Sequence, residues 1–255
     1  MNLLISLRSE LFKTKRTVAF YFTIAAAAFA PFMSMLDLVF DGMGKDHEKD
    51  IFNELFTTKF MMTGAVILPW FIILISTLLA QIEYRNNTWK QVLTSPQSKA
   101  SIFFAKFINI HLLIFLFLFT NHLLMLINAI ILHFMHPSLH VLNQPLNWPK
   151  IANTLVSSYL VLLGMCAIQF WLALRFRNFI APVAIGISSW FIGTILVLQL
   201  KASFAQYFPY SFHVYARFPE YQNKDLTNIY LTSVVYAVLF LVIGFLNFRR
   251  RRMSA

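Results

Sequence analysis

Three histidines in one long uncharged run are the residues of this sequence most able to do chemistry. His111, His122 and His133 are spaced eleven residues apart, and at about 100° per residue a helix returns each one to within about 20° of the last. The same spacing separates neighbouring histidines by roughly 16 Å along the helix axis, too far for two of them to share a metal ion. They therefore form a polar stripe on one helix face, and we expect no metal site there.

Two asparagines, Asn121 and Asn128, lie on a neighbouring face of the same run. Polar side chains inside a bilayer usually face protein or water, because lipid offers them no hydrogen-bond partners. We therefore expect five residues of this run to line either a translocation path or a seam between helices: His111, Asn121, His122, Asn128 and His133.

Catalytic groups of other kinds are scarce. The six long apolar runs defined below contain no Asp or Glu, so neither a carboxylate pair nor a Ser/His/Asp arrangement can form within them. The seven glycines never make the G-x-x-x-x-G-K-[ST] pattern that cradles the phosphates of ATP. The sequence therefore predicts no catalytic residue and no cofactor in this chain, and a histidine-dependent membrane enzyme stays an alternative.

The elements that carry these residues follow from composition. Of the 255 residues, 58% are hydrophobic and only 12% are charged, about half the charged share of a soluble domain. A helix needs about 20 mostly apolar residues to cross a bilayer. Six runs qualify, and they predict an all-α, polytopic membrane protein that forms a single domain over residues 1–255: residues 17–36, 60–82, 107–134, 151–174, 178–200 and 226–248.

The distribution of charge predicts how these spans are oriented. Six crossings put both termini on one side, and that side carries two thirds of the 21 Lys and Arg residues, while eight of the ten acids fall on the other. Cytoplasmic loops are the ones enriched in Lys and Arg. Both termini are therefore expected in the cytoplasm. The net charge of +11 then reflects topology, and no nucleic-acid partner is expected.

The first sixteen residues have the pattern of an amphipathic helix. Leu3, Leu4, Leu7 and Leu11 are spaced for one helix face, with basic residues among the other positions. Such a segment can lie in the membrane interface. We expect an elbow helix that carries movement into the first span, with a passive lipid anchor as the alternative.

The segment between the second and third spans carries the most distinctive residues. Glu83 ends the second span, Thr88-Trp89-Lys90 follows, and the segment continues through Leu93 and a Ser-Pro break at Pro96 to Lys106. We expect a short helix after residue 87 or 88, and a second helix, capped by Ser98, that leads into the third span. A Trp beside Arg and Lys suits protein docking, and a headgroup-binding loop is the alternative.

Together with the Glu10–Arg16 stretch and the six-span plan, this segment resembles the permeases of ABC-2 type transporters, and among them most closely the branch that includes the lantibiotic-immunity permeases. The resemblance implies that the segment is a coupling helix, which docks in a groove of an ATP-binding subunit. The positions that match the family's coupling segment are Glu83, Thr88, Trp89, Lys90, Leu93, Pro96 and Lys106.

The resemblance also implies partners and a function. It implies a separate ATPase subunit that holds ATP and Mg²⁺, a second permease copy in a homo- or heterodimer, and contact with membrane lipids. The uncharged, aromatic spans favour export of an amphipathic, peptide or lipid-like substrate, as in resistance to antimicrobial peptides. A membrane scaffold or sensor that transports nothing is the alternative.

The link from Lys201 to His213 is too aromatic for an ordinary loop and too short to span a membrane twice. In the resembled family this link dips back into the outer leaflet as short helices. A belt of aromatic side chains at the headgroup level is the alternative.

Overall fold

The structure is a computed structural model that describes residues 3–40, 51–58, 60–86, 88–94, 97–137, 141–143, 145–221 and 226–250. It is 89% helical and has no strand in these ranges, which confirms the all-α class. Six segments are long and apolar enough to cross a membrane, as predicted: Val18–Asp37, Phe52–Arg85, Lys99–Met135, Trp148–Arg175, Ile180–Leu198 and Thr227–Arg249.

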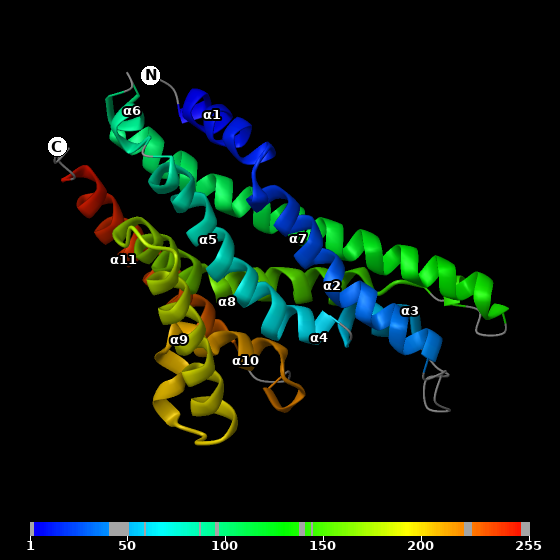
Figure 1. The fold of residues 1–255 in the computed structure, drawn as a ribbon. Helices are drawn as coiled ribbons and strands as arrows, with labels where there is room; N and C mark the ends of the chain where they lie inside the picture. The colour runs from blue at the N-terminus through cyan, green and yellow to red at the C-terminus, as the bar shows by residue number, and fades with distance from the viewer. Residues whose placement is uncertain are drawn as a thin grey trace.

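These segments belong to a longer series of helices (Figure 1). In chain order the α-helices are α1 (Leu3–Lys15), α2 (Val18–Phe40), α3 (Ile51–Thr57), α4 (Phe60–Met62), α5 (Leu68–Arg85), α6 (Trp89–Thr94), α7 (Lys99–Met135), α8 (Trp148–Arg175), α9 (Ile180–Leu198), α10 (Phe212–Arg217) and α11 (Thr227–Arg249). A π-helical turn, η1 (Thr63–Ile67), joins α4 to α5, and short 3-10 turns are η3 (Val141–Asn143), η4 (Ser203–Tyr207), η5 (Pro209–Ser211) and η6 (Pro219–Tyr221).

The third span begins earlier than the apolar run predicts. Its helix, α7, starts at Lys99, where the Ser98 hydroxyl accepts a hydrogen bond from the backbone N–H of Ser101 at 3.0 Å. Ser98 is therefore the helix cap that the sequence predicts. The uncharged run stops at Lys106 because that residue is charged, but its charge is paired inside the protein, so the helix and its buried face continue past it.

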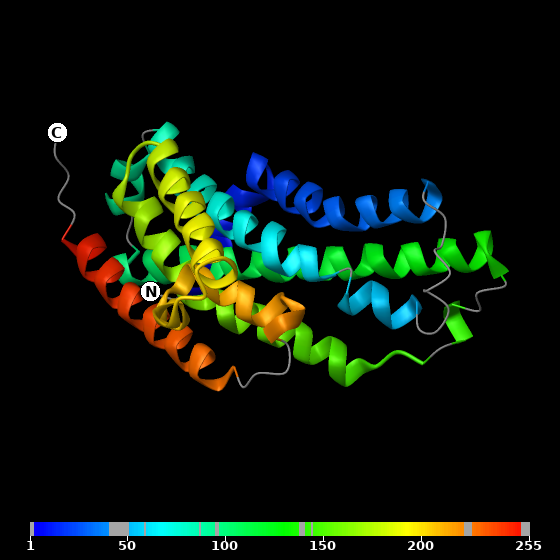
Figure 2. The ribbon, with the colours of Figure 1, turned by 90° about the horizontal axis from the view of Figure 1, so that it is seen from below.

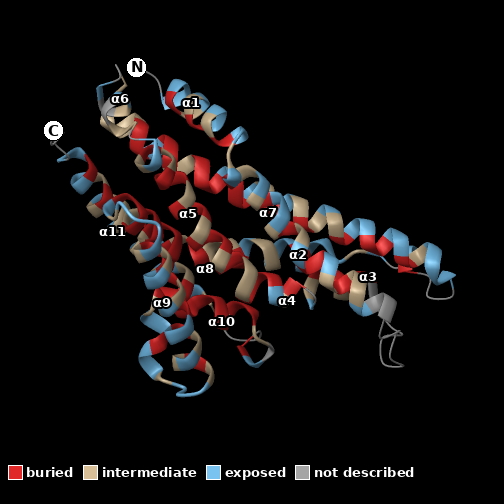
Figure 3. Cartoon of the chain, in the orientation of Figure 1, coloured by how far each residue is buried: buried red, intermediate tan, exposed pale blue. Residues whose placement is uncertain are grey.

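Helices α5, α7 and α8 form the centre of the molecule, and α2, α9 and α11 lie around them. In the most apolar part of the segment Phe52–Arg85, which includes α5, and in that of α8, 67% of residues are buried, against 22% in α11. Figure 3 shows this contrast between the helices. The core includes an aromatic contact between Phe71 of α5 and Phe117 of α7, whose ring centroids are 4.7 Å apart. The exposed apolar side chains of α2, α9 and α11 suit contact with lipid.

The two ends of the molecule differ in what they carry. Figures 1 and 2 show α1, α6 and both chain termini at one end, while α3 and α10 lie toward the other. This is the arrangement that an even number of crossings requires. The predicted cytoplasmic orientation of the termini stays a prediction.

The link between α9 and α11 folds back against the bundle. At Gly193 of α9 a Cβ atom would lie 2.4 Å from the carbonyl oxygen of Tyr210, so only glycine admits the link at this distance. Tyr210 and Phe212 are buried, and the Tyr210 hydroxyl donates to Gln169 of α8 at 3.0 Å. The predicted short helices are present, and these two aromatic residues belong to the protein core rather than to a belt at the headgroup level.

Candidate coupling site and polar helix seam

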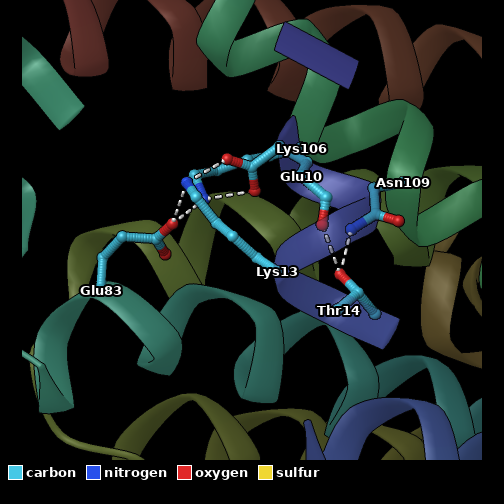
Figure 4. A network of polar contacts seen from close by, with 6 residues as sticks. All are labelled: Glu10, Lys13, Thr14, Glu83, Lys106 and Asn109. Carbon is cyan, nitrogen blue, oxygen red and sulfur yellow. Dashed lines mark hydrogen bonds and ion pairs between the residues drawn. The ribbon is translucent and has the colours of Figure 1, made fainter. Parts of the chain in front are cut away.

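Four charged side chains from three helices form one ion network at the end of the molecule that carries the termini. Lys106 of α7 is the central cation: its Nζ lies 2.8 Å from Oε2 of Glu10 in α1 and 2.5 Å from Oε1 of Glu83 in α5. Lys13 lies beside them, 2.6 Å from Glu10 and 3.2 Å from Glu83. Figure 4 shows the two lysines between the two carboxylates. The network therefore joins α1, α5 and α7.

The network is buried apart from Lys13. Glu83 is 1% exposed and Lys106 is 2% exposed, whereas about a third of the Lys13 side chain is accessible. Removing a charge from water costs several kcal/mol unless a partner compensates it. Two carboxylates and two ammonium groups balance here. Oε2 of Glu83 has no hydrogen-bond partner among the described residues, so this carboxylate binds both lysines through one oxygen.

Helix α1 docks on α7 through a polar face rather than an apolar one. Ser6, Glu10 and Thr14 are its buried residues, spaced four apart on one side of the helix. Asn109 of α7, one turn from Lys106, donates to the Thr14 hydroxyl at 2.7 Å. The leucines predicted to lie in the membrane interface are on other faces, and Leu4 is strongly exposed. The helix predicted over the first sixteen residues is present, with leucines directed away from the protein.

The electrostatics of α1 give the network a pH dependence. Burial alone would raise the pKa of Glu10, but Lys106 and Lys13 outweigh burial, and the net pKa is lowered from its ordinary 4.5. Burial likewise would lower the pKa of Lys13, but Glu10 and Glu83 raise it above its ordinary 10.5. The contribution of Glu10 to stability is therefore complete above pH 4.5 and is lost as the pH falls through the lowered pKa. The contribution of Lys13 to stability is complete below pH 10.5 and is lost as the pH rises through the raised pKa of Lys13.

We expect the network's contribution to the thermal unfolding midpoint in detergent to be constant between about pH 5 and 10. Below and above that pH range, the midpoint should decrease. The measurement is a series of unfolding curves across pH for the wild type and for Glu10→Gln. The variant should lose part of the decline on the acid side, because it has no carboxyl to protonate at this position. An equal acid decline in both proteins would contradict the assignment of the effect to Glu10.

The short helix α6 confirms the local structure predicted for the loop, and it rests on the network through Trp89. The Trp89 ring lies with its centroid 5.6 Å from Nζ of Lys106, 5.4 Å from the Tyr84 ring and 5.8 Å from the Phe248 ring of α11. The Tyr84 hydroxyl in turn donates to the carbonyl of Leu174 at the end of α8. Trp89 therefore connects α6 to α5, α7 and α11 at once.

The predicted coupling residues fall into three groups. Glu83 and Lys106 are buried and bind other parts of this chain, while Thr88 and Trp89 are half-buried at the start of α6. Lys90 and Leu93 lie in α6, and their side chains are outside the description, as is the whole of Pro96. The structure thus brings Glu83, Trp89 and Lys106 together. Their role in coupling to an ATPase stays a prediction.

The two predicted asparagines of α7 bind α2 at its internal proline. Pro31 has no N–H to give to the carbonyl of Ala27 four residues earlier, and Nδ2 of Asn121 donates to that carbonyl at 2.9 Å. Asn128 donates to the carbonyl of Pro31 itself at 2.7 Å. Both asparagines thus bond a neighbouring helix of the same chain. Their assignment to a translocation path or a helix seam stays a prediction.

A second proline is compensated in the same way. Pro69 in α5 has no N–H to give to the carbonyl of Ala65 four residues earlier in η1, and Nε1 of Trp190 in α9 donates to that oxygen at 3.2 Å. In lipid an unsatisfied carbonyl costs several kcal/mol. Each proline is thereby tied to a particular neighbouring helix.

The three histidines of the stripe have separate surroundings. Nδ1 of His111 lies 3.0 Å from the hydroxyl of Tyr159 in α8, His122 bonds the carbonyl of Leu118 within its own helix at 2.9 Å, and His133 lies near the far end of α7. The described residues contain no group of three or more His, Cys, Asp or Glu side chains that could hold a metal ion. Nothing in these contacts favours a shared catalytic role.

The sequence analysis missed Glu10, Lys13, Thr14 and Asn109 as members of the site. A signal for them was available in the spacing of Ser6, Glu10 and Thr14, which puts three polar side chains on one face of a helix. Lys106 and Asn109, three apart, give the matching face of α7. The prediction for this helix rested instead on its leucines, which lie on other faces than the buried polar one.

Comparison with known proteins agrees with this architecture. The family model described as ABC-2 family transporter protein matches residues 6–193, most of the chain. No curated protein sequence matches the chain. The matched range includes residues 6–15 of α1 and the whole of α5, α6 and α7, and so every residue of the ion network. The chain therefore belongs to the ABC-2 transporter family and is a multi-pass membrane protein.

Proposed function

We propose that this protein is the permease subunit of an ATP-driven exporter in the inner membrane of a bacterium. A separate ATPase subunit holds ATP and Mg²⁺ and docks on the α6 side of the molecule, and two permease copies form the transport unit. The observation that carries the proposal is the buried ion network, which fastens the N-terminal helix and two central spans together directly beside α6.

The network supports a specific route for the movement. A push on α6 reaches Trp89, whose ring contacts Lys106 and Phe248. Lys106 is bonded to both Glu10 and Glu83, so α1, α5 and α7 would respond as one body. Glu83 and Lys106 then act as positioning residues inside the permease, and the exposed surface of α6 makes the contact with the ATPase.

The spans support an amphipathic, peptide or lipid-like cargo. A cavity of about 520 Å³ lies between α3, α7 and α8, and nearly all of its lining is aromatic or aliphatic, with His122 and Tyr159 as its polar members. Cavities of this size and character accept apolar groups of ligands. Export of antimicrobial peptides is one case of this cargo class.

The proposal is tested by co-purifying the protein with its ATPase subunit after Trp89→Ala. We expect about tenfold weaker association, since α6 loses the aromatic contacts that hold its docking surface in place on the bundle. Trp89→Phe should restore most of the association, because the ring contacts remain. Trp148→Ala is a matched control, as Trp148 is exposed at the start of α8 near the other end of the molecule. Undiminished association of Trp89→Ala would contradict the docking model.

A further inference from the structure

One arginine in the link between α9 and α11 is buried without an acidic partner. Arg217, the last residue of α10, is 8% exposed. No ion pair to it occurs among the described residues, and its Nε has no hydrogen-bond partner there. The acid nearest to it in the sequence, Glu220, is exposed. A buried and unpaired guanidinium is costly, so native proteins supply it with a counter-ion.

A glycine provides the space that the Arg217 side chain occupies. The side chain of Arg217 passes over Gly64 in the π-helical turn η1, where a Cβ atom would lie 2.7 Å from its Cδ and 3.4 Å from the hydroxyl oxygen of Ser158 in α8. Thr63, the preceding residue of the same turn, is fully buried, and its hydroxyl also lacks a hydrogen-bond partner. π-Helical turns are frequent at functional sites. The Arg217 Nε and the Thr63 hydroxyl are thus both buried without a hydrogen-bond partner among the described residues.

The charge of Arg217 persists in this setting. Burial lowers its pKa to about 10, with Tyr230 acting in the opposite direction, so the guanidinium is ionised at neutral pH. Its location is also informative. Helix α10 lies away from the chain termini and from α6 (Figure 1), and Phe204 and Tyr207 of the same link are strongly exposed. Exposed aromatic side chains suit the headgroup level of a membrane.

We propose that Arg217, at the junction of α10, η1 and α8, is the centre of an anion site that binds a phosphate group at the headgroup level on the side of the membrane opposite the termini. A guanidinium is planar and donates two parallel hydrogen bonds to phosphate oxygens. The phosphate belongs either to a phospholipid headgroup or to a free phosphate ion. The site stands apart from the ion network and does not depend on the identity of the transported cargo.

The test is ligand-dependent stabilisation of the purified protein in a neutral detergent. Three additives are compared: inorganic phosphate, a short-chain phosphatidylglycerol, and a short-chain diacylglycerol that has the same chains and no phosphate. At a concentration about a hundred times the dissociation constant, a ligand of the native state should raise the unfolding midpoint by about 5 °C or more. A rise with phosphatidylglycerol alone identifies the lipid headgroup as the source. A rise with both phosphorylated compounds shows that the phosphate group suffices.

Two variants assign the effect to this site. Arg217→Gln should abolish the rise, and Gly64→Ala should greatly reduce it while retaining the arginine, because the new methyl group displaces the flexible Arg217 side chain. If Arg217→Gln fails to fold, Gly64→Ala still shows whether the stabilisation depends on this site. Lys201→Gln, which removes an exposed cation of the same link, is the matched control and should keep the full rise. The proposal is overturned if no phosphorylated compound stabilises the wild type, if diacylglycerol stabilises it equally, or if both site variants keep the full rise.

Discussion

Replacement of Lys106 by methionine should lower the free energy of unfolding by about 3–5 kcal/mol, because it leaves the carboxylates of Glu10 and Glu83 buried without their central cation. Methionine keeps most of the volume of the lysine stem, so the loss is mainly electrostatic. The measurement is a denaturant titration of the purified protein in detergent. We also expect α1 to detach from α7, which limited proteolysis near the N-terminus would detect.

Two further variants separate the buried charge from the surface one. Lys13→Met removes a cation that is about one-third exposed and should cost less than about 1 kcal/mol, as partly solvated ion pairs contribute little. A triple variant, Glu10→Gln, Glu83→Gln and Lys106→Met, removes every buried charge of the network and should recover much of the stability that Lys106→Met loses. If the single and triple variants were equally unstable, the penalty would come from packing, and the electrostatic account would fail.

Replacement of Asn121 by leucine should cost about 2 kcal/mol, since it leaves the carbonyl of Ala27 without a hydrogen-bond donor. Pro31 is the reason that this carbonyl needs an outside donor. The same titration in detergent measures the loss. Leucine is clearly larger than asparagine, so overpacking on this face of α7 must be distinguished from the missing hydrogen bond.

A double-mutant cycle with Pro31→Ala makes that distinction. With alanine at position 31, the backbone N–H of that residue can bond the Ala27 carbonyl, so Asn121 is no longer required. Oδ1 of Asn121 has no hydrogen-bond partner among the described residues, so in the Pro31→Ala background Asn121→Leu should be neutral or slightly stabilising. A cost that is the same in both backgrounds would show that leucine disturbs packing.

The spans were predictable because lipid imposes a simple rule. A backbone that crosses a bilayer has to be helical and apolar over about 20 residues, and six uncharged runs satisfied that rule. The short helix α6 and the Ser98 cap were predictable for a local reason, since caps and breaks depend on residues within one turn. The aromatic link was recognised as unusual from its composition alone.

The partners of individual polar residues were not predictable, because they depend on which helix faces meet. Glu83 and Lys106 were assigned to a docking segment through a family resemblance. No local pattern indicated that Lys106 binds Glu10, 96 residues away, or that Glu83 binds Lys13, 70 residues away. Asn121 and Asn128 were recognised as polar residues of a seam or path, but their partners are carbonyls of α2, and carbonyls carry no residue-specific signal. Prolines at positions 31 and 69 were the available clue, since each one frees an acceptor.

The ion network also has a consequence for how the protein is made. Glu10 and Lys13 leave the ribosome before their partners, because Glu83 lies 70 residues after Lys13 and Lys106 lies 96 residues after Glu10. Until Lys106 has been synthesised, Glu10 has only its own neighbour Lys13 to neutralise it, and α1 has no polar face to dock on. Helix α1 is thus fastened only when the third span has been inserted, although it is synthesised before the first span.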